Sequence, residues 1–117
     1  VNLIFIGGHF NRAKDGFIGT LAIEQIHNYR FDLSFIGTVG MNIHDGKVTT
    51  YDVEDGLTKK EVMDASKKCY LVAENEKLNL DGNYVFGHLS EFTGYIGEQE
   101  LGSPFKEKIM EYGLEII

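Results

Sequence analysis

The 117 residues carry 18 acidic side chains against 11 basic ones, so the formal net charge at pH 7 is −7. Hydrophobic residues make up 43% of the chain and charged residues 25%, proportions typical of one soluble globular domain. Binding to nucleic-acid phosphates needs clustered Lys and Arg, so any nucleic-acid role would have to reside in another segment. No apolar run is long enough to span a bilayer. The single cysteine, Cys69, excludes an internal disulfide and favours a reducing, cytoplasmic location.

The first third of the chain predicts a strand, a helix and a second strand. Residues 1–6, apolar apart from Asn2, predict a buried strand from the first position, which leads us to expect a fragment of a longer protein. Residues 9–15 are polar and predict a loop. Residues 20–29 place apolar side chains at helical spacing, and residues 33–36 predict a strand buried on both faces. This order is the unit that builds parallel sheets through right-handed crossovers.

The turn that follows the second strand is a candidate ligand loop. It contains Gly37, Thr38, Val39 and Gly40, and open α/β sheets bind small ligands where such loops leave the carboxyl ends of strands. The glycines would let the backbone approach a ligand closely. A plain connection into a hairpin is the alternative, because residues 45–46, Asp-Gly, predict a tight turn into a strand at 47–50.

The rest of the chain continues the alternation. A helix is expected within residues 52–68, with its secure part starting near Leu57 because Gly56 would weaken the first turn. Buried strands are predicted at 69–73, 84–88 and 94–97. Ser103 is the expected N-cap of a last helix with Pro104 at its first position and Gly113 at its end, before a final strand at 114–117. The predicted fold class is α/β, a mostly parallel sheet flanked by helices.

Polar residues also follow the strand at 69–73. Lys77 lies beside Glu74 at that strand end and suits an anionic ligand, since a Lys ammonium binds phosphate as a point charge. The alternative is a solvated surface lysine, and Lys59 is likewise typical of the exposed face of a helix. The four histidines lack the spacing of a metal site, and Ser34 and Cys69 lie inside apolar strands rather than on exposed turns. We therefore expect no catalytic residue, no metal and no cofactor.

Taken together, these landmarks resemble one family. A strand ends in Gly7-Gly8, Gly-Phe-Ile-Gly follows at 16–19, Asp-Leu-Ser-Phe-Ile-Gly-Thr-Val-Gly at 32–40, and Leu-Val-Ala-Glu-Asn-Glu-Lys at 71–77. The order and spacing are similar to the C-terminal effector domain of DeoR-family sugar-responsive transcriptional repressors, such as those of lactose or fructose phosphotransferase operons. The resemblance covers essentially residues 1–117.

The resemblance implies a fragment of a fold related to ribose-5-phosphate isomerase and CoA transferases. It also implies a phosphorylated sugar as effector and a homo-oligomer. Operator DNA would be bound only through a separate N-terminal winged helix-turn-helix. The family's Asp-Ser-Ser-Lys falls on residues 74–77, where Lys77 is retained and Glu74 is a near substitute. Its ligand loop falls on 37–40 and its helix lysine on Lys59.

Two parts of the family pattern differ here or are missing. The late Ile-Thr-Asp of the family is Ile96-Gly97-Glu98 in this chain. Members also carry, upstream of the Gly-Gly strand, a further strand and a Gly-Thr-Thr-type loop that would cradle the sugar phosphate.

The preferred function is therefore a sugar-phosphate-sensing and oligomerisation domain of a DeoR-family repressor of carbohydrate genes, without membrane association. A sugar-phosphate isomerase or deaminase on the same fold is the main alternative. That chemistry needs a carboxylate placed to move a proton, and the loop at 37–42 contains no acidic residue. A plain interaction module is a third possibility that the residues leave open.

Overall fold

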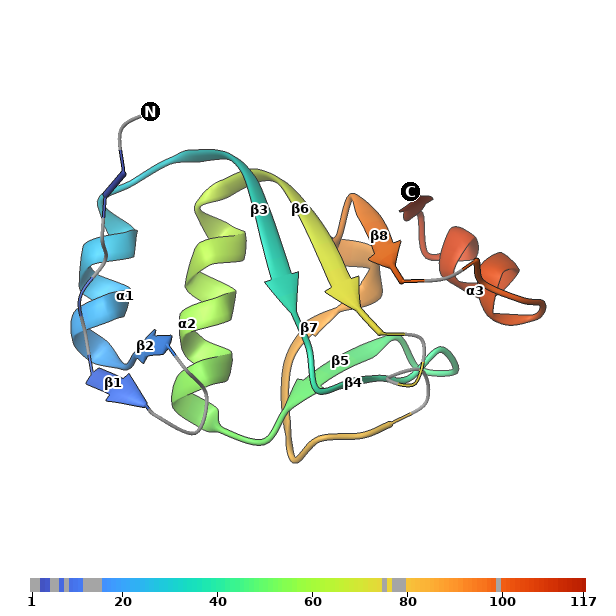
Figure 1. Ribbon diagram of the computed structural model, residues 1–117, viewed down its shortest axis with the longest axis horizontal. Helices are drawn as coiled ribbons and strands as arrows, with labels where there is room; N and C mark the ends of the chain where they lie inside the picture. The colour runs from blue at the N-terminus through green and yellow to red at the C-terminus, as the bar shows by residue number, and fades with distance from the viewer. Residues whose placement is uncertain are drawn as a thin grey trace.

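The computed structural model describes residues 3–4, 7, 9–11, 16–74, 76, 80–98 and 100–117. Within these, the helices are α1 (Thr20–His27), α2 (Val53–Asp64) and α3 (Phe105–Glu111), with a 3₁₀ turn, η2 (Leu89–Glu91). The strands are β1 (His9–Asn11), β2 (Gly16–Ile18), β3 (Phe31–Gly37), β4 (Gly40–Met41), β5 (Lys47–Thr50), β6 (Ser66–Ala73), β7 (Tyr84–His88), β8 (Gly94–Gly97) and β9 (Glu115–Ile116). Strands and helices alternate along most of the chain (Figure 1).

The largest sheet has four strands in the order β3-β6-β8-β9, and all its pairings are parallel. Ser34 pairs with Cys69, Leu71 with Tyr95, and Tyr95 with Ile116. Two small antiparallel sheets accompany it, β4-β5-β7 and β1-β2. The predicted fold class, α/β with a mostly parallel sheet flanked by helices, is confirmed. Among the described residues, no helix is both long and apolar enough to cross a membrane.

The hydrophobic core lies where one face of the parallel sheet meets the β4-β5-β7 sheet and the helices α2 and α3. The parallel sheet contributes fully buried side chains such as Leu71 and Tyr95, and the small sheet contributes Met41, Val48 and Phe86. Burial of this apolar surface is the main favourable term that holds the two sheets together. The carboxyl ends of the parallel neighbours β3, β6 and β8 thereby lie at the same edge of the four-stranded sheet (Figure 1).

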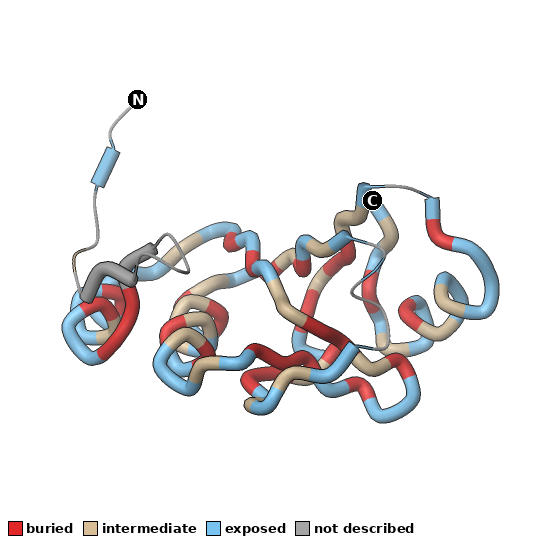
Figure 2. The backbone as a smooth tube through the Cα atoms, turned by 60° about the horizontal axis from the view of Figure 1, so that its bottom comes forward, coloured by how far each residue is buried: buried red, intermediate tan, exposed pale blue. Residues whose placement is uncertain are grey.

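The prediction that the central strands are buried on both faces is wrong. Burial alternates along β3, where Ser34 and Ile36 are buried while Leu33 and Phe35 are 50% and 62% exposed. The tube in Figure 2 changes between buried and exposed segments along its strands in the same way. The alternation arises because strand side chains point to opposite faces, and only one face of β3 packs on the described core.

The N-terminal predictions are partly wrong. Residues 9–15 were expected to form a loop, but His9–Asn11 forms β1 and pairs antiparallel with β2, Phe10 opposite Phe17. The strand expected at 1–6 falls mostly outside the described residues. Its two described positions, Leu3 and Ile4, are exposed and not in a strand.

Helix α2 starts earlier than expected. Its N-cap is Asp52, whose carboxylate accepts a hydrogen bond from the Glu54 N–H at 2.9 Å, so Gly56 lies inside the helix. A Cβ on Gly56 would come within 2.6 Å of the Tyr84 ring, so packing requires glycine despite its low helix propensity. The helix ends at Asp64 because residues 66–68 instead extend β6 beside β3.

The last helix confirms its expected apolar face but not its expected cap. Ile109 is buried, with Phe105 and Tyr112 packed against the core, and Gly113 has φ 95°, as a helix-ending glycine requires. The N-cap is Pro104, not Ser103. The Ser103 hydroxyl donates to the carboxylate of Glu107 instead of capping the backbone.

Candidate functional site

A pocket of about 390 Å³ opens where three adjacent parallel strands end. The end of β3 supplies Gly37 and Thr38, the end of β6 supplies Glu74, and the end of β8 supplies Gly97 and Glu98. Apolar side chains of β6 and β8 complete the lining: Val72, Ala73 and Ile96. The structure thus brings together three of the residues predicted from the sequence, at the edge where open α/β sheets bind ligands.

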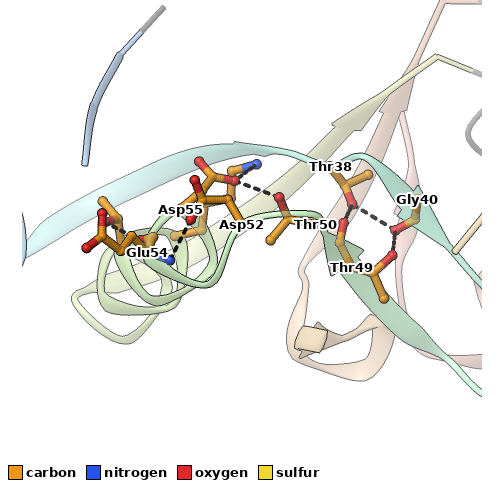
Figure 3. Close-up of polar contacts among 9 residues, drawn as sticks. Thr38, Gly40, Thr49, Thr50, Asp52, Glu54 and Asp55 are labelled. Atoms are coloured by element: carbon orange, nitrogen blue, oxygen red, sulfur yellow. Dashed lines mark hydrogen bonds and ion pairs between the residues drawn. The ribbon is translucent and has the colours of Figure 1, made fainter. Parts of the chain in front are cut away.

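Thr38 holds the shape of the turn beside this pocket (Figure 3). Its Oγ1 lies 2.8 Å from the Gly40 carbonyl oxygen and 2.9 Å from that of Thr49, so its single proton is directed to the backbone. Thr49 extends the network, because its hydroxyl donates to the Gly40 carbonyl at 3.3 Å and accepts from the Gly82 N–H at 2.7 Å. The Thr38 hydroxyl can therefore contact a ligand only as an acceptor.

The two glycines of the predicted ligand loop serve different purposes. A Cβ on Gly40 would overlap the backbone carbonyl of Leu80, so glycine is required there for the segment at 80–82 to pack on the turn. A Cβ on Gly37 would meet nothing within 4 Å, so the space above Gly37 is open to the pocket. Val39 is half-buried, donates its N–H to the Thr49 carbonyl at 3.2 Å and does not line the pocket.

Lys59 lies on α2, away from the pocket lining. Its Nζ is 3.1 Å from the Asp55 carboxylate and 5.4 Å from the centroid of the Phe86 ring. Asp55 also accepts a hydrogen bond from the buried Thr50 hydroxyl at 2.8 Å, which Figure 3 shows beside the α2 N-terminus. The contacts of Lys59 in this structure therefore stabilise the junction of β5 with α2, and its predicted role at the effector site stays a prediction.

Lys77, the predicted phosphate contact, lies outside the described residues. Among the described residues that line the pocket, the charged groups are the carboxylates of Glu74 and Glu98. Sequence reasoning did not select Glu98, although its position at the carboxyl end of a predicted strand was a usable signal. Burial, followed by the charge of Glu98, raises the pKa of Tyr95 on the same strand.

The pocket can bind a ligand but holds no recognisable catalytic set. Its lining contains no His, Cys, Lys or Arg among the described residues, and no described group of His, Cys, Asp and Glu could hold a metal ion. Carboxylates and backbone groups of this kind accept and donate hydrogen bonds to a polyhydroxylated ligand. The lining of the pocket therefore supports ligand binding rather than catalysis.

Comparison with known proteins agrees with that geometry. Residues 1–99 match the family described as the DeoR C terminal sensor domain. The chain belongs to this family. The resemblance inferred from the order of its motifs is thereby confirmed.

The DeoR sensor domain is similar to curated transcriptional repressors over three quarters or more of its length. It is 24% identical over 117 residues to the HTH-type transcriptional repressor GlcR of Bacillus subtilis, covering 100% of this chain and 45% of that protein. It is 22% identical over 117 residues to the putative aga operon transcriptional repressor of Escherichia coli O157:H7, again 100% of this chain and 43% of that protein. The glycerol-3-phosphate regulon repressor of Escherichia coli K12 is 25% identical over 88 residues, 75% of this chain and 34% of that protein.

Two consequences follow for the sensor domain. It spans less than half the length of these curated relatives. Family membership, with relatives named as repressors, confirms the prediction that the domain is not an enzyme.

Proposed function

We propose that this domain senses a phosphorylated sugar for a DeoR-family repressor of carbohydrate genes. The observation that carries the proposal is the pocket at the shared carboxyl edge of β3, β6 and β8, lined by Gly37, Thr38 and Glu74. A relative named for the glycerol-3-phosphate regulon supports a phosphorylated, hydroxyl-bearing effector. Effector binding would shift a homo-oligomer of the full-length repressor away from the geometry that binds operator DNA.

Three of the predicted residues have distinct roles in this proposal. Glu74 accepts hydrogen bonds from sugar hydroxyls, since an ionised carboxylate is an acceptor only. Gly37 leaves room for the ligand beside the backbone, and Lys77 contributes the positive charge for the phosphate. A charge-assisted contact of this kind is worth about 1.5–3 kcal/mol.

The test is titration calorimetry on the full-length repressor. The probes are fructose 1-phosphate, glucose 6-phosphate and glycerol 3-phosphate, each compared with its unphosphorylated form. We expect a phosphorylated probe to bind far more tightly and Lys77→Ala to weaken it by roughly 10- to 100-fold. Lys60→Ala, at an exposed position of α2, is the matched control and should bind as the wild type does.

Two results would contradict the proposal at different points. Equal affinity in Lys77→Ala would remove Lys77 from the site while leaving the sensing function. If none of the three sugar phosphates binds to a folded full-length protein, the domain does not sense this class of effector.

The proposal includes the organisation of the longer protein. We infer that a helix-turn-helix domain and the first part of the sensor domain precede residue 1 in a cytoplasmic repressor. The relatives are more than twice as long as this chain, and its net charge of −7 is unsuited to contact with operator phosphates. Sequencing the coding region immediately upstream tests this directly, because the inference requires a helix-turn-helix there.

A further inference from the structure

Two adjacent threonines at the end of β5, Thr49 and Thr50, are equally buried but serve different parts of the molecule. Their side chains are 3% and 1% exposed, and neighbouring side chains of a strand point to opposite sides. The Thr50 hydroxyl donates to the Asp55 carboxylate at 2.8 Å, at the start of α2. The Thr49 hydroxyl instead bonds to the backbone beside the pocket, and Figure 3 shows its contact with Gly40. Each buried hydroxyl is therefore fixed by its own partners.

The side of β5 that carries Thr49 is covered by residues 80–82 rather than by the hydrophobic core. Val48, the preceding residue, is fully buried in that core, and the pairing of β5 with β7 shifts register between Val48 and Thr49. Such bulges re-aim side chains and are frequent beside functional sites. Thr49 Oγ1 accepts a hydrogen bond from the Gly82 N–H at 2.7 Å. Gly82 lies so close that a Cβ there would come within 2.6 Å of the Thr50 carbonyl oxygen.

The Thr49 hydroxyl joins two chain connections that each supply part of the pocket lining. The connection from β3 to β4 carries the pocket residue Thr38, and at its end the Gly40 carbonyl accepts from Thr49 Oγ1 at 3.3 Å. The connection from β6 to β7, residues 74–83, begins with Glu74 in the pocket lining and includes Gly82 near its end. One side chain thus holds both connections, although Thr49 itself does not line the pocket.

The backbone of Thr49 makes further contacts with the same turn. Its carbonyl oxygen accepts from the Thr38 hydroxyl at 2.9 Å and from the Val39 N–H at 3.2 Å, and Thr49 pairs with Gly40 in the ladder between β4 and β5. These backbone contacts remain when the side chain is replaced. The contact with the Gly82 N–H, in contrast, needs the hydroxyl, because a valine of the same shape offers no acceptor. A substitution can therefore release residues 80–82 without removing the turn.

We propose that Thr49 is a positioning residue for effector binding, whose hydroxyl holds the two connections in the geometry that receives the ligand. The inference rests on the proposed function, because it names a residue that acts on the sensing pocket without contacting the effector. Groups that bind a ligand must be held within about 0.5 Å of their productive geometry by supporting hydrogen bonds. Thr38 and Glu74 lie on the two connections, so their spacing depends on the tie that Thr49 provides.

The test compares three variants of the full-length repressor by titration calorimetry with fructose 1-phosphate, glucose 6-phosphate and glycerol 3-phosphate. Thr49→Val keeps the shape of the side chain but removes its hydroxyl, and should raise the Kd of the probe that binds about 10-fold. Thr50→Val removes an equally buried hydroxyl that bonds to Asp55, and is the matched control, with a Kd within about twofold of the wild type. Thr49→Ser keeps a hydroxyl and should restore the Kd to within about threefold.

A second measurement needs no effector, so it is independent of sugar-phosphate binding. The amide exchange of Gly82 is read by NMR on the full-length repressor with labelled glycine. Thr49→Val should accelerate this exchange roughly 10-fold or more, because the acceptor of the Gly82 N–H is gone, whereas Thr50→Val and Thr49→Ser should keep its rate. The melting temperatures of the two valine variants should fall by similar amounts, since each loses buried hydrogen bonds. A loss of affinity in Thr49→Val alone then has a cause other than stability.

Four results would overturn the proposal. An unchanged Kd in Thr49→Val would show that the tie does not affect the pocket, and equal weakening in Thr50→Val would assign the effect to general stability. A Kd of Thr49→Ser as high as that of Thr49→Val would exclude the hydroxyl as the cause. An unchanged Gly82 exchange rate in Thr49→Val would show that Thr49 does not hold residues 80–82. Failure of the wild type to bind any of the three probes would instead contradict the proposed function, and the Gly82 exchange rate would still decide whether the tie exists.

Discussion

Both faces of the four-stranded sheet carry apolar side chains, but the two faces lie in different environments. On the inner face, Leu71 is fully buried and Ile36 is 4% exposed, in contact with the core formed with the β4-β5-β7 sheet. On the outer face, Leu33 and Phe35 are 50% and 62% exposed. Parallel sheets are normally covered on both faces. The apolar side chains of β3 on the outer face therefore lack, among the described residues, the cover that a parallel sheet normally has.

The same substitution on each face of the sheet should have very different effects on stability. Leu71→Ala should lower the free energy of unfolding of the 117-residue chain by about 2–5 kcal/mol, because it leaves a cavity in the closed core. Leu33→Ala should change it by roughly 0.5 kcal/mol or less, because the side chain is half solvated. Urea unfolding followed by circular dichroism measures both. Similar losses in the two variants would show that the outer face is also covered.

The two glycines of the candidate ligand loop should also differ in their effect on stability, by a smaller amount. Gly40→Ala should destabilise the domain by about 1–3 kcal/mol, because its Cβ would overlap the rigid backbone of Leu80. Gly37→Ala should leave stability nearly unchanged, since its Cβ meets nothing within 4 Å, yet it should weaken effector binding by narrowing the pocket. Thermal unfolding and calorimetry separate the two outcomes. Full effector affinity in Gly37→Ala would place the ligand elsewhere.

Much of the fold was predictable because apolar runs mark strands wherever the chain is buried. The strands predicted at 84–88 and 94–97 have the bounds of β7 and β8, and the strand predicted at 69–73 lies within β6, which begins three residues earlier, at Ser66. The predicted bounds were wrong where contacts between residues far apart in the sequence decide the local structure. The low helix propensity of glycine predicts a helix that starts after Gly56, but the position of Gly56 inside α2 depends on packing against Tyr84, 28 positions further along the chain.

The candidate site was predictable to the same degree. Strand ends identified Gly37, Thr38 and Glu74, because the carboxyl ends of parallel strands gather at one edge. Spacing could not reveal that the Lys59 ammonium pairs with Asp55, four residues earlier, and packs over Phe86. Nor could it reveal that the Thr38 proton is used by the turn itself.

Two ion pairs that differ in solvent exposure, Asp55 with Lys59 and Asp32 with Lys67, should differ in their contribution to stability. Asp55→Ala removes the partner of Lys59 and of the buried Thr50 hydroxyl, and should cost about 1–3 kcal/mol of unfolding free energy. Asp32→Ala removes a 3.5 Å pair with Lys67 in which the side chains are 91% and 78% exposed, and should have almost no effect because solvent screens such pairs. Chemical denaturation of both variants in low and high salt is the measurement. A comparable loss in Asp32→Ala would contradict this ranking.

The smallest expected effect concerns the exposed start of α3. The Ser103 hydroxyl donates to the Glu107 carboxylate, and this hydrogen bond is the main cause that lowers the pKa of Glu107, followed by the backbone N–H of Glu107. Because the folded-state pKa is lowered, the stabilisation is present above the ordinary Glu pKa and is lost as pH falls through the lowered value. Ser103→Ala should therefore raise the Glu107 pKa toward its ordinary value, measured by NMR titration of the side-chain carboxyl carbon. Gly102→Ala, where a Cβ meets nothing within 4 Å, is the control and should leave that titration unchanged. An unaltered Glu107 titration in Ser103→Ala would show that the Ser103 hydroxyl does not hold the carboxylate in solution.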